Sequence, residues 1–440
     1  MTDQDGAGRR WRLGNTALSW TAMGYALVLL GLVVGRPEVI GIGMPLVIGM
    51  LWSWSHRPTD TPDVTLRDCR YRTESGRVEG SLVVTTVPGV ATISVRVGSE
   101  GHRPADALLS ASSSRPVTLA VSGTRTGRRS VFDVAHILSA DDHVAQSVPA
   151  AVGPVDVKVL PRTRPSGRLP LPFRLQGLTG AHDSRRIGDG GDFHDISEFV
   201  AGDRLRRIDW RVTARRIGQG GAASQMLDRL YVRRSHATAD AVVMLVLDSR
   251  DDIGPDVSTW ASSRPVHPDD QTSLDIAREA AGTLARGYLE AGDRVGVVDL
   301  GRTSRALRPA GGRRHLSRVL HQLADARPEG EVQVRIRPPQ LPSGAMAVVF
   351  STFLDDETVG LAELWRAAGH RVLAVDVIPP IDTERITRQE SLAHRIVELE
   401  RGDRMFRLRA GGVDVVPWSD DRSLDAGLQA STRRRPRERR

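Results

Sequence analysis

The chain has 440 residues, enough for about three folding units. Hydrophobic residues make up 40% and charged residues 26%, a balance that supports packed domains and excludes a wholly disordered chain. The formal net charge is +8, and Lys158 is the only lysine, so nearly all positive charge is arginine. Such a charge suits an anionic membrane surface, nucleic acid or an acidic partner protein. The single cysteine, Cys69, excludes an intramolecular disulfide and a zinc site built from cysteines.

Two uncharged apolar stretches lie near the N-terminus. The first covers residues 13–35, and after a three-residue interruption the second covers residues 39–55. At about 1.5 Å per residue both are long enough to cross a bilayer core of roughly 30 Å. We therefore expect a transmembrane helical hairpin over residues 13–57. A cleaved signal peptide is the alternative, but its apolar region would be shorter and no second span would follow.

Cationic residues flank the predicted hairpin at both ends. Arg9, Arg10 and Arg12 precede the first stretch. His56 and Arg57 follow the second stretch, whereas the turn between the stretches has no net charge. Because an excess of arginine marks cytoplasmic flanks, we predict a protein of the inner (plasma) membrane. Both termini and the main domains would be cytoplasmic.

The segment after the hairpin is expected to form a β-sandwich. Short runs rich in Val, Thr and Ile are separated by Gly, Pro, Ser and Asp at the spacing typical of sandwiches. These runs cover residues 81–87, 91–97, 116–121 and 155–160. The Pro- and Arg-rich stretch at residues 161–172 is typical of a linker.

Strand and helix patterns alternate in the C-terminal half. The apolar run at residues 241–248 is typical of a buried parallel strand and ends in Asp248. Further strands are expected at 294–301, 345–352, 371–379 and 413–418, and helices at 273–292, 312–326, 357–370 and 392–399. This alternation predicts an α/β domain of the Rossmann-like class, with a mostly parallel sheet and helices on both faces. The expected parts are an arm (1–12), the hairpin (13–57), the sandwich (58–162), a linker with a signature segment (163–235), the α/β domain (236–432) and a basic tail (433–440).

The most informative motif is GGDFHDISEFVAGDRLRRIDWRVTARR at residues 190–216. Gly202 and Asp203 predict a turn, and Trp210 is expected to fill a core. Asp203 is expected to pair with an arginine, and Asp209 with an arginine or with backbone amides, because arginine makes bidentate contacts with carboxylates. The segment from Gly202 to Arg215 is expected to fix a domain junction by locking the sandwich linker against the first strand of the α/β domain. A catalytic role is the weaker alternative, since no nucleophile stands beside a base and His194 lacks an evident partner.

This motif resembles the signature of the bacterial domain of unknown function 58 family. Ser197 stands where that family usually has arginine. The matching positions are Phe193, Ile196, Phe199, Gly202, Asp203, Arg206, Ile208, Asp209, Trp210, Thr213, Ala214 and Arg215. The residues assigned to the junction are Gly202, Asp203, Arg206, Ile208, Asp209, Trp210, Thr213 and Arg215. The resemblance implies that the α/β domain is von Willebrand factor A-like. It also implies a chaperone-like or assembly role beside a MoxR-type AAA+ ATPase.

Von Willebrand factor A-like domains often hold Mg²⁺ through a D-x-S-x-S motif after the first strand, because oxygen ligands suit that cation. Asp248 is in place, but Arg250 and Asp252 occupy the two serine positions. Thr352 ends the later strand where an aspartate is common. We expect Arg250 to pair with Asp248 and to replace the cation, so neither a cofactor nor Mg²⁺ is predicted, although the acidic cluster keeps Mg²⁺ open. The degenerate rim would consist of Asp248, Asp251, Asp252, Thr352 and Asp355.

These patterns favour a membrane-anchored, non-enzymatic scaffold. It would act with a MoxR-type ATPase in the maturation of protein complexes or in cell-envelope stress. The alternative is a hydrolase or other enzyme with a site between the sandwich and the α/β domain; no nucleophile–base set in the sequence supports it. Gly311-Gly312 lacks the lysine and Ser/Thr of a P-loop. Aromatic residues make up only 4%, which argues against nucleic-acid binding by base stacking.

Overall fold

The computed structural model divides the chain into two compact units: Met1–Val159 with His267–Asp269, and Leu160–Val266 with Asp270–Arg440. It describes residues 11–85, 87–111, 116–123, 125–167, 169–175, 180, 182–201, 203–217, 230–260, 266–267, 270–302, 306–328, 338–382, 386–418 and 427. Gly202 and the basic tail at 433–440 therefore lie outside the described residues.

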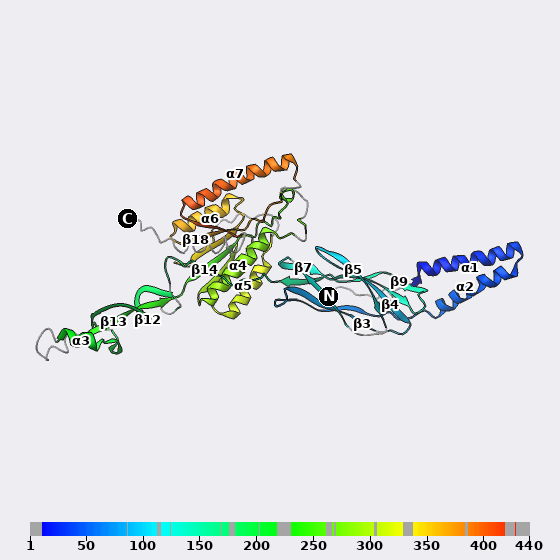
Figure 1. Ribbon diagram of the computed structural model, residues 1–440, viewed down its shortest axis with the longest axis horizontal. Helices are drawn as coiled ribbons and strands as arrows, with labels where there is room; N and C mark the ends of the chain where they lie inside the picture. The colour runs from blue at the N-terminus through cyan, green and yellow to red at the C-terminus, as the bar shows by residue number, and fades with distance from the viewer. Residues whose placement is uncertain are drawn as a thin grey trace. The chain divides into compact units, whose positions relative to one another are not determined.

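Two helices near the N-terminus are long and apolar enough to cross a membrane. They are α1 (Asn15–Val34) and α2 (Pro37–Ser55), drawn in blue in Figure 1. A Cβ added at Gly43 would lie 2.7 Å from the carbonyl oxygen of Gly24, and one at Gly31 would lie 2.6 Å from Cγ1 of Ile40. The small residues therefore let the helices approach closely, as in helix pairs within bilayers. Large apolar side chains such as Val33 point outward instead.

The rest of the first unit is β-rich, as the sequence predicts. One sheet has the order β1-β9-β8-β4-β5 with β10 beside β8, a second is β2-β3-β6, and a third is β11-β7. The first sheet contains β1 (Trp11–Leu13), β4 (Val90–Ser99), β5 (His102–Ser110), β8 (Asp133–Ala140), β9 (Ala145–Ser147) and β10 (Ala150–Val152). The other two contain β2 (Val64–Arg72), β3 (Arg77–Val84), β6 (Val117–Ser122), β7 (Gly127–Val131) and β11 (Val155–Val159). Alternate side chains of these sheets, among them Leu82, Ile93 and Leu138, meet in one apolar core.

The second unit contains a mixed six-stranded sheet with the order β16-β15-β14-β17-β18-β19. The strands are β14 (Val242–Leu247), β15 (Arg294–Asp299), β16 (Leu307–Ala310), β17 (Met346–Ser351), β18 (Val372–Asp376) and β19 (Asp414–Pro417). All neighbouring pairs are parallel except β15 and β16. The parallel strands were expected from their apolar runs; the short edge strand β16 was not.

Four helices cover the two faces of this sheet (Figure 1). They are α4 (Ser273–Glu290), α5 (Arg313–Asp325), α6 (Asp356–Ala367) and α7 (Arg388–Ala410). Leu245 of β14 belongs to the core that includes α4 and α5. Its neighbour Met244 belongs to the opposite core with α6 and α7. The prediction of helices on both faces is confirmed, and α7 is much longer than the expected 392–399.

Part of the predicted linker is packed against the α/β core. The hydroxyl of Tyr288 in α4 donates to the carbonyl of Pro170 at 2.7 Å, and Nη1 of Arg371 donates to the carbonyl of Leu171 at 2.7 Å. Leu169 also packs on the core. The segment that was expected to connect domains is thus part of the second unit.

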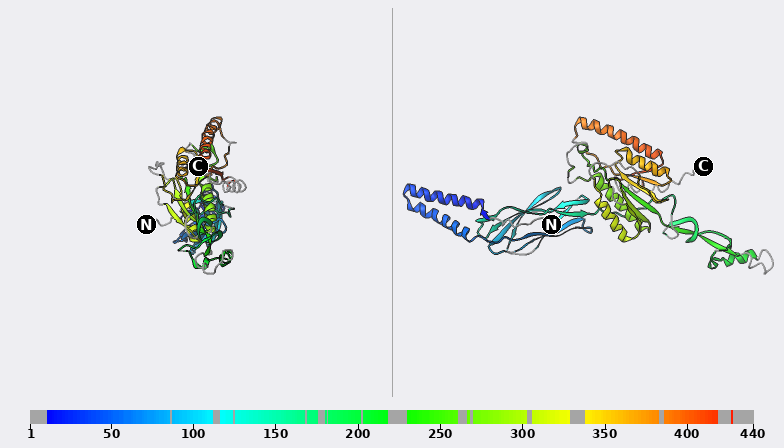
Figure 2. Two further views of the ribbon diagram at one scale, coloured as in Figure 1. Left: turned by 90° about the vertical axis from the view of Figure 1, so that its left-hand side faces the viewer. Right: turned by 180° about the vertical axis from the view of Figure 1, so that it is seen from behind.

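A separate two-stranded hairpin precedes β14. It consists of β12 (His182–Glu198) and β13 (Tyr231–Ala239), which pair only with each other among the described strands. The short helices η1 (Leu205–Arg207) and α3 (Trp210–Ile217) lie at the turn end of this hairpin (Figure 2). At its other end, β13 leads directly into β14. The sequence did not predict this hairpin, because residues 182–198 lack alternating apolar residues.

Candidate functional site

The strand order reverses at β14, the first strand of the six-stranded sheet. The chain passes from β14 to β15 on one side and later to β17 on the other. In open α/β sheets, ligands bind at such a reversal, outside the carboxyl ends of the strands. Asp248 follows the last residue of β14, and its backbone N–H donates to the carbonyl of Phe350 at 3.0 Å. The carboxyl-end rim at Asp248 is therefore the first place to look for function.

Arg250 and Asp248 form a buried ion pair at this rim. Nε of Arg250 donates to Oδ1 of Asp248 at 2.8 Å, and Nη2 donates to Oδ2 at 3.0 Å. Both side chains are only 5% exposed. The prediction that Arg250 pairs with Asp248 is confirmed, and the two parallel bonds have the bidentate geometry that guanidinium groups favour.

Residues from the start of α6 complete the network around Arg250. Nη1 of Arg250 donates to Oε2 of Glu357 at 2.6 Å, and Nη2 lies 2.9 Å from Oδ2 of Asp355. The hydroxyl of Thr358 accepts from Arg250 at 2.6 Å and donates to Asp248 at 2.8 Å. Asp355 also caps α6 by accepting from two backbone N–H groups. The guanidinium is thus held by three carboxylates and a hydroxyl.

The turn between β17 and α6 brings a further hydroxyl to Asp248. Ser351 donates to Oδ2 of Asp248 at 2.8 Å, and the N–H of Phe353 donates to the Ser351 oxygen at 3.1 Å. Phe353 is fully buried and has a φ of 54°, a conformation that costs energy for a residue other than glycine. Burial of its ring holds this strained turn in place.

A second buried pair lies beside the first. The hydroxyl of Ser249 donates to Oδ1 of Asp299 at 2.5 Å, and the N–H of Gly301 donates to the same oxygen at 3.1 Å. A Cβ at Gly301 would lie 2.3 Å from the Ser249 hydroxyl, so only glycine fits there. Ser249 is completely buried, and its hydroxyl is engaged, which makes it a poor nucleophile.

The electrostatics follow from burial and from this pairing. Burial alone would raise the pKa of Asp248, but the hydrogen bonds and the charge of Arg250 outweigh it and lower that pKa. Burial would lower the pKa of Arg250, and its carboxylate partners raise it by more. Burial, followed by the charges of Asp248 and Asp355, raises the pKa of Asp251. Burial also raises the pKa of Asp299, despite the hydrogen bond from Ser249.

The residues at the rim do not fit a magnesium ion as they stand. Among the oxygens that could serve as ligands, those of Asp248, Ser351, Thr358 and Asp355 already contact Arg250 or one another. A divalent cation among them would face the guanidinium charge at close range. The predicted rim residue Thr352 contributes its carbonyl to Nε of Arg401 at 2.8 Å rather than to this network.

Sequence reasoning placed Asp248, Asp251, Asp252 and Asp355 together, and all four follow β14 or precede α6. It missed five residues that complete the rim: Ser249, Asp299, Ser351, Glu357 and Thr358. Ser351 is the last residue of β17 and the second-last residue of the predicted strand at 345–352, which is a usable signal for a rim residue. Glu357 and Thr358 lie more than a hundred positions from Arg250, and only the order of the strands in the sheet brings them there.

The signature segment folds back on its own hairpin. Oδ1 of Asp209 accepts from the N–H groups of Arg211 and Val212 at 3.1 and 3.0 Å and so caps α3. The buried Thr213 hydroxyl accepts from the N–H of Tyr231 at 3.1 Å. Ile208 forms an antiparallel bridge with Val232. The Thr213 and Ile208 contacts attach the segment to β13, whereas the Asp209 cap lies within the segment.

Asp203 pairs with an arginine outside the signature. Its Oδ2 accepts from the N–H of Val200 at 3.0 Å and from Nη2 of Arg234 at 3.2 Å. The backbone hydrogen bond is the largest cause that lowers the pKa of Asp203, although burial opposes it. The expected pairing of Asp203 with an arginine is thus confirmed, with Arg234 of β13 as the partner.

The prediction that Trp210 fills a core is wrong. Its side chain is 63% exposed, because it is the first residue of α3 and the buried face of that helix is occupied by Thr213. Arg206 and Arg215 are exposed as well. The proposed lock between the sandwich linker and β14 is also not what the contacts show, since those of the segment go to β13. The hairpin instead meets the α/β core through Nε2 of His182, 2.9 Å from the buried carboxylate of Asp293.

The two candidate regions are separated within the second unit. The rim lies at the carboxyl end of β14, whereas β13 joins the amino end of β14. The signature segment is therefore joined to the end of β14 that lies opposite the rim. The described contacts of the signature segment lie at the turn end of the hairpin, so this end is where we look for its role.

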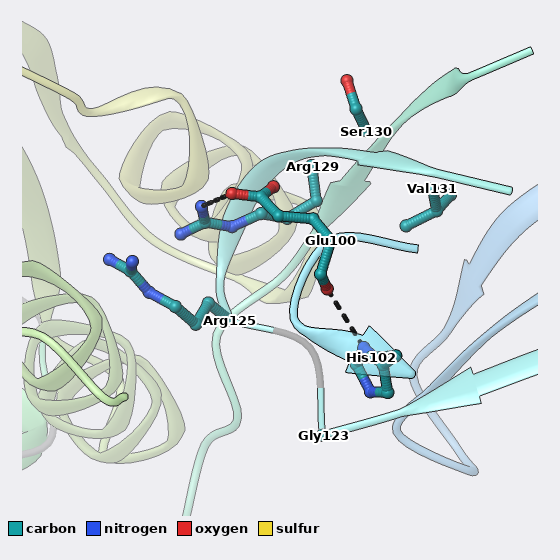
Figure 3. Close-up of a pocket in the computed structure, with 7 residues that line it drawn as sticks. All are labelled: Glu100, His102, Gly123, Arg125, Arg129, Ser130 and Val131. Carbon is teal, nitrogen blue, oxygen red and sulfur yellow. Dashed lines mark hydrogen bonds and ion pairs between the residues drawn. The ribbon is translucent and has the colours of Figure 1, made fainter. Parts of the chain in front are cut away.

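A small pocket in the first unit offers no better site. It lies beside β5 and β7 and is shown in Figure 3. Its lining residues are Glu100, His102, Gly123, Arg125, Arg129, Ser130 and Val131. His102 bonds to the carbonyls of Glu100 and Ser122 at 3.0 and 2.8 Å, and the carboxylate of Glu100 lies 4.0 Å from Arg129. Its polar groups are thus engaged within the protein.

Comparisons with known proteins place the signature and the rim in one family region. Residues 195–409 match the model of the family described as protein of unknown function DUF58. This range includes the signature from Asp195 onward and the rim residues from Asp248 to Thr358. A comparison with curated proteins found no match. The resemblance seen in the sequence is therefore confirmed: residues 195–409 of this chain match the DUF58 family.

Proposed function

We propose that this protein is a membrane-anchored, non-enzymatic scaffold that binds a partner protein at the rim of its α/β domain. The observation that carries the proposal is the Arg250 guanidinium at the centre of the rim. It neutralises the buried Asp248 and uses the hydroxyl of Thr358. Ser249, which follows Asp248 in the chain, is buried and bonded to Asp299, and the hydroxyl of Ser351 is bonded to Asp248. A rim built in this way is suited to rigid recognition rather than to proton transfer.

The path of the chain supports the anchor. β1 precedes α1 and pairs with β9, and β2 follows α2 within the same compact unit. Both ends of the helical pair thus return to one folded unit, so a pair that crosses a bilayer must start and end on the same side. Because arginines flank the helical pair, we expect that side to be the cytoplasm. The core shared by the sheets of this unit supports a β-sandwich.

The rim has the features expected of a binding surface. The central strand, the reversal of strand order and the Asp248 position support a von Willebrand factor A-like domain with Arg250 in place of the metal. Around the buried pair, the carboxylates of Asp355 and Glu357 remain partly exposed. A partner that presents lysine or arginine would complement them. The family resemblance makes a MoxR-type AAA+ ATPase the expected partner.

The test is co-purification of the ATPase with the full chain from native membranes. The variant combines Asp355→Asn and Glu357→Gln, which removes these two partly exposed charges and keeps the side-chain sizes. A loss of two favourable charge contacts should reduce recovery of the ATPase by about tenfold or more.

The matched control is Glu398→Gln with Glu400→Gln, which removes two exposed charges from the outer side of α7. This control should retain the ATPase at the wild-type level. Equal recovery with the rim variant and the wild type would contradict binding at the rim.

A further inference from the structure

The turn end of the β12–β13 hairpin exposes apolar side chains that nothing in the described part of the chain covers. We call this region the apex surface. Its members are Phe193, Ile196, Val200, Leu205 and Trp210, and each is at least 36% exposed. They belong to one local structure, because Ile196 pairs with Arg233 across the hairpin and Ile208 bridges to Val232. Exposing aromatic and aliphatic side chains together is costly in water and indicates an interaction surface.

The charges around the apex surface are positive. The described residues 193–215 and 230–239 contain seven arginines and four carboxylates, a net charge of +3. Three of these carboxylates are engaged inside the hairpin. Asp203 accepts from Arg234, Asp209 caps α3, and Glu198 accepts from the Tyr231 hydroxyl at 3.3 Å. These bonds do not remove the carboxylate charges, so a partner meets the net charge of +3.

At least one arginine lies directly against an apolar side chain of the apex surface. The guanidinium of Arg233 lies 5.3 Å from the ring centre of Phe193. Arg206 and Arg211 are exposed neighbours of Leu205 and Trp210 in the chain. Tryptophan, phenylalanine and leucine interleaved with arginine are the composition of segments that enter the interface of an anionic bilayer.

We propose that the apex surface binds the surface of an anionic lipid bilayer. The arginines would lie at the lipid phosphates, and Trp210 and Leu205 would enter the interfacial layer. A bilayer is favoured over a protein because the surface sits at the end of a projecting hairpin (Figure 1). A rigid protein would need a matching cavity, whereas a fluid bilayer adapts to a convex tip. The inference rests on the proposed anchor, which keeps the chain near lipid and raises the effective concentration of that surface.

The test uses the full chain reconstituted into vesicles, with an environment-sensitive fluorophore at one engineered cysteine. Cys69→Ser removes the native thiol, and Ala201→Cys places the label on an exposed position between Val200 and Leu205. A matched label at Ser391→Cys reports an exposed position on α7 of the same unit. The vesicles contain phosphatidylcholine with or without phosphatidylglycerol, and nitroxide-labelled lipids serve as quenchers.

In vesicles with phosphatidylglycerol, the label at residue 201 should shift to the blue and be quenched by headgroup-proximal nitroxides. The label at residue 391 should remain in water. Arg206→Gln and Arg211→Gln should each weaken the apex contact by roughly fivefold. High salt should weaken it as well.

If the chain is retained in vesicles but the label at residue 201 stays as water-exposed as the label at residue 391, the inference is overturned. The proposed anchor is not affected by that result. A chain that is not retained in vesicles would overturn both the anchor and the inference that rests on it. A label at 201 that shifts only when soluble protein is added, with no quenching from lipid, would also overturn it, in favour of an acidic protein partner.

Discussion

Arg250 holds Asp248 through two hydrogen bonds, Nε to Oδ1 at 2.8 Å and Nη2 to Oδ2 at 3.0 Å, where the strand order of the sheet reverses. Under the proposed function, this is the position that a cation occupies in a metal-binding von Willebrand factor A-like domain. The side chain of Arg250 supplies the positive charge instead, and it is covalently part of the chain. If this proposal holds, the rim does not depend on a metal ion.

Removal of Arg250 should destabilise the α/β unit strongly. Arg250→Met leaves the buried Asp248 charge without its partner, which costs about 3–5 kcal/mol in comparable pairs. Restoring neutrality with Asp248→Asn in the same chain should recover part of that loss. Thermal melts of the single and double variants measure both effects.

The matched control for this prediction is Arg96→Met in the first unit. Arg96 contacts Asp106 with the same bidentate geometry, at 2.7 and 3.0 Å, but the pair is exposed. Water and salt screen an exposed pair, so this variant should melt close to the wild type. If Arg96→Met and Arg250→Met destabilise the chain equally, burial is not the source of the effect.

Asp251 should make the stability of the rim depend on pH. Its pKa is raised in the folded chain, chiefly by burial and then by Asp248 and Asp355. A raised carboxyl pKa means that the folded state favours the protonated form. Its favourable contribution is present below the ordinary aspartate pKa of about 3.9 and is lost as the pH rises through the folded-state pKa.

Asp251→Asn should therefore raise the melting temperature at neutral pH and have little effect near pH ~4 and below. Melting curves across this range test the sign. A variant that is destabilised at neutral pH would show that the Asp251 charge is favourable at the rim, contrary to the account.

The signature segment should respond to substitution according to burial, not residue size. Thr213→Val leaves the N–H of Tyr231 without its acceptor and should cost about 1–3 kcal/mol. Asp209→Ala removes the cap of α3 and should cost about 0.5–2 kcal/mol. Trp210→Ala, at an exposed position, should stay within about 0.5 kcal/mol of the wild type. Thermal melts rank the three variants, and a ranking led by Trp210→Ala would restore the core role that the sequence predicted.

The membrane topology gives a separate prediction. A reporter fused after Arg57 should behave as a cytoplasmic protein, because arginines flank both helices and the turn between them is neutral. Activity of an exported reporter at this position would contradict the orientation. It would leave the paired helices themselves in place.

The α/β fold could be predicted because its strands are buried on both faces. A run such as 241–248 carries no polar residue until it ends at Asp248, so both the strand and the rim position follow from the sequence. Arg250 is two residues further along, which made its pairing with Asp248 predictable as well. The partners Glu357 and Thr358 could not be found in this way, because nothing local in the sequence states which strand lies beside β14.

The wrong prediction of a buried Trp210 has a physical cause. Trp210 was expected to be buried because large aromatic residues usually are, yet the apex surface exposes it together with Leu205. Leu392, Ile396 and Leu399 are the residues that predicted a helix in the region of α7. All three are exposed, and the helix is attached through Met405 and Leu408 instead.

The central claim is that Arg250 takes the place of a metal ion at the rim, and Mg²⁺ titration calorimetry on the full chain tests it most directly. The wild type should show no stoichiometric binding, because the guanidinium already occupies the space between Asp248, Asp355 and Thr358. Arg250→Ser restores the serine of the metal motif and should gain measurable Mg²⁺ affinity, provided that it folds as judged by its melting curve. Stoichiometric binding to the wild type at micromolar concentration, abolished by Asp248→Ala, would contradict the account.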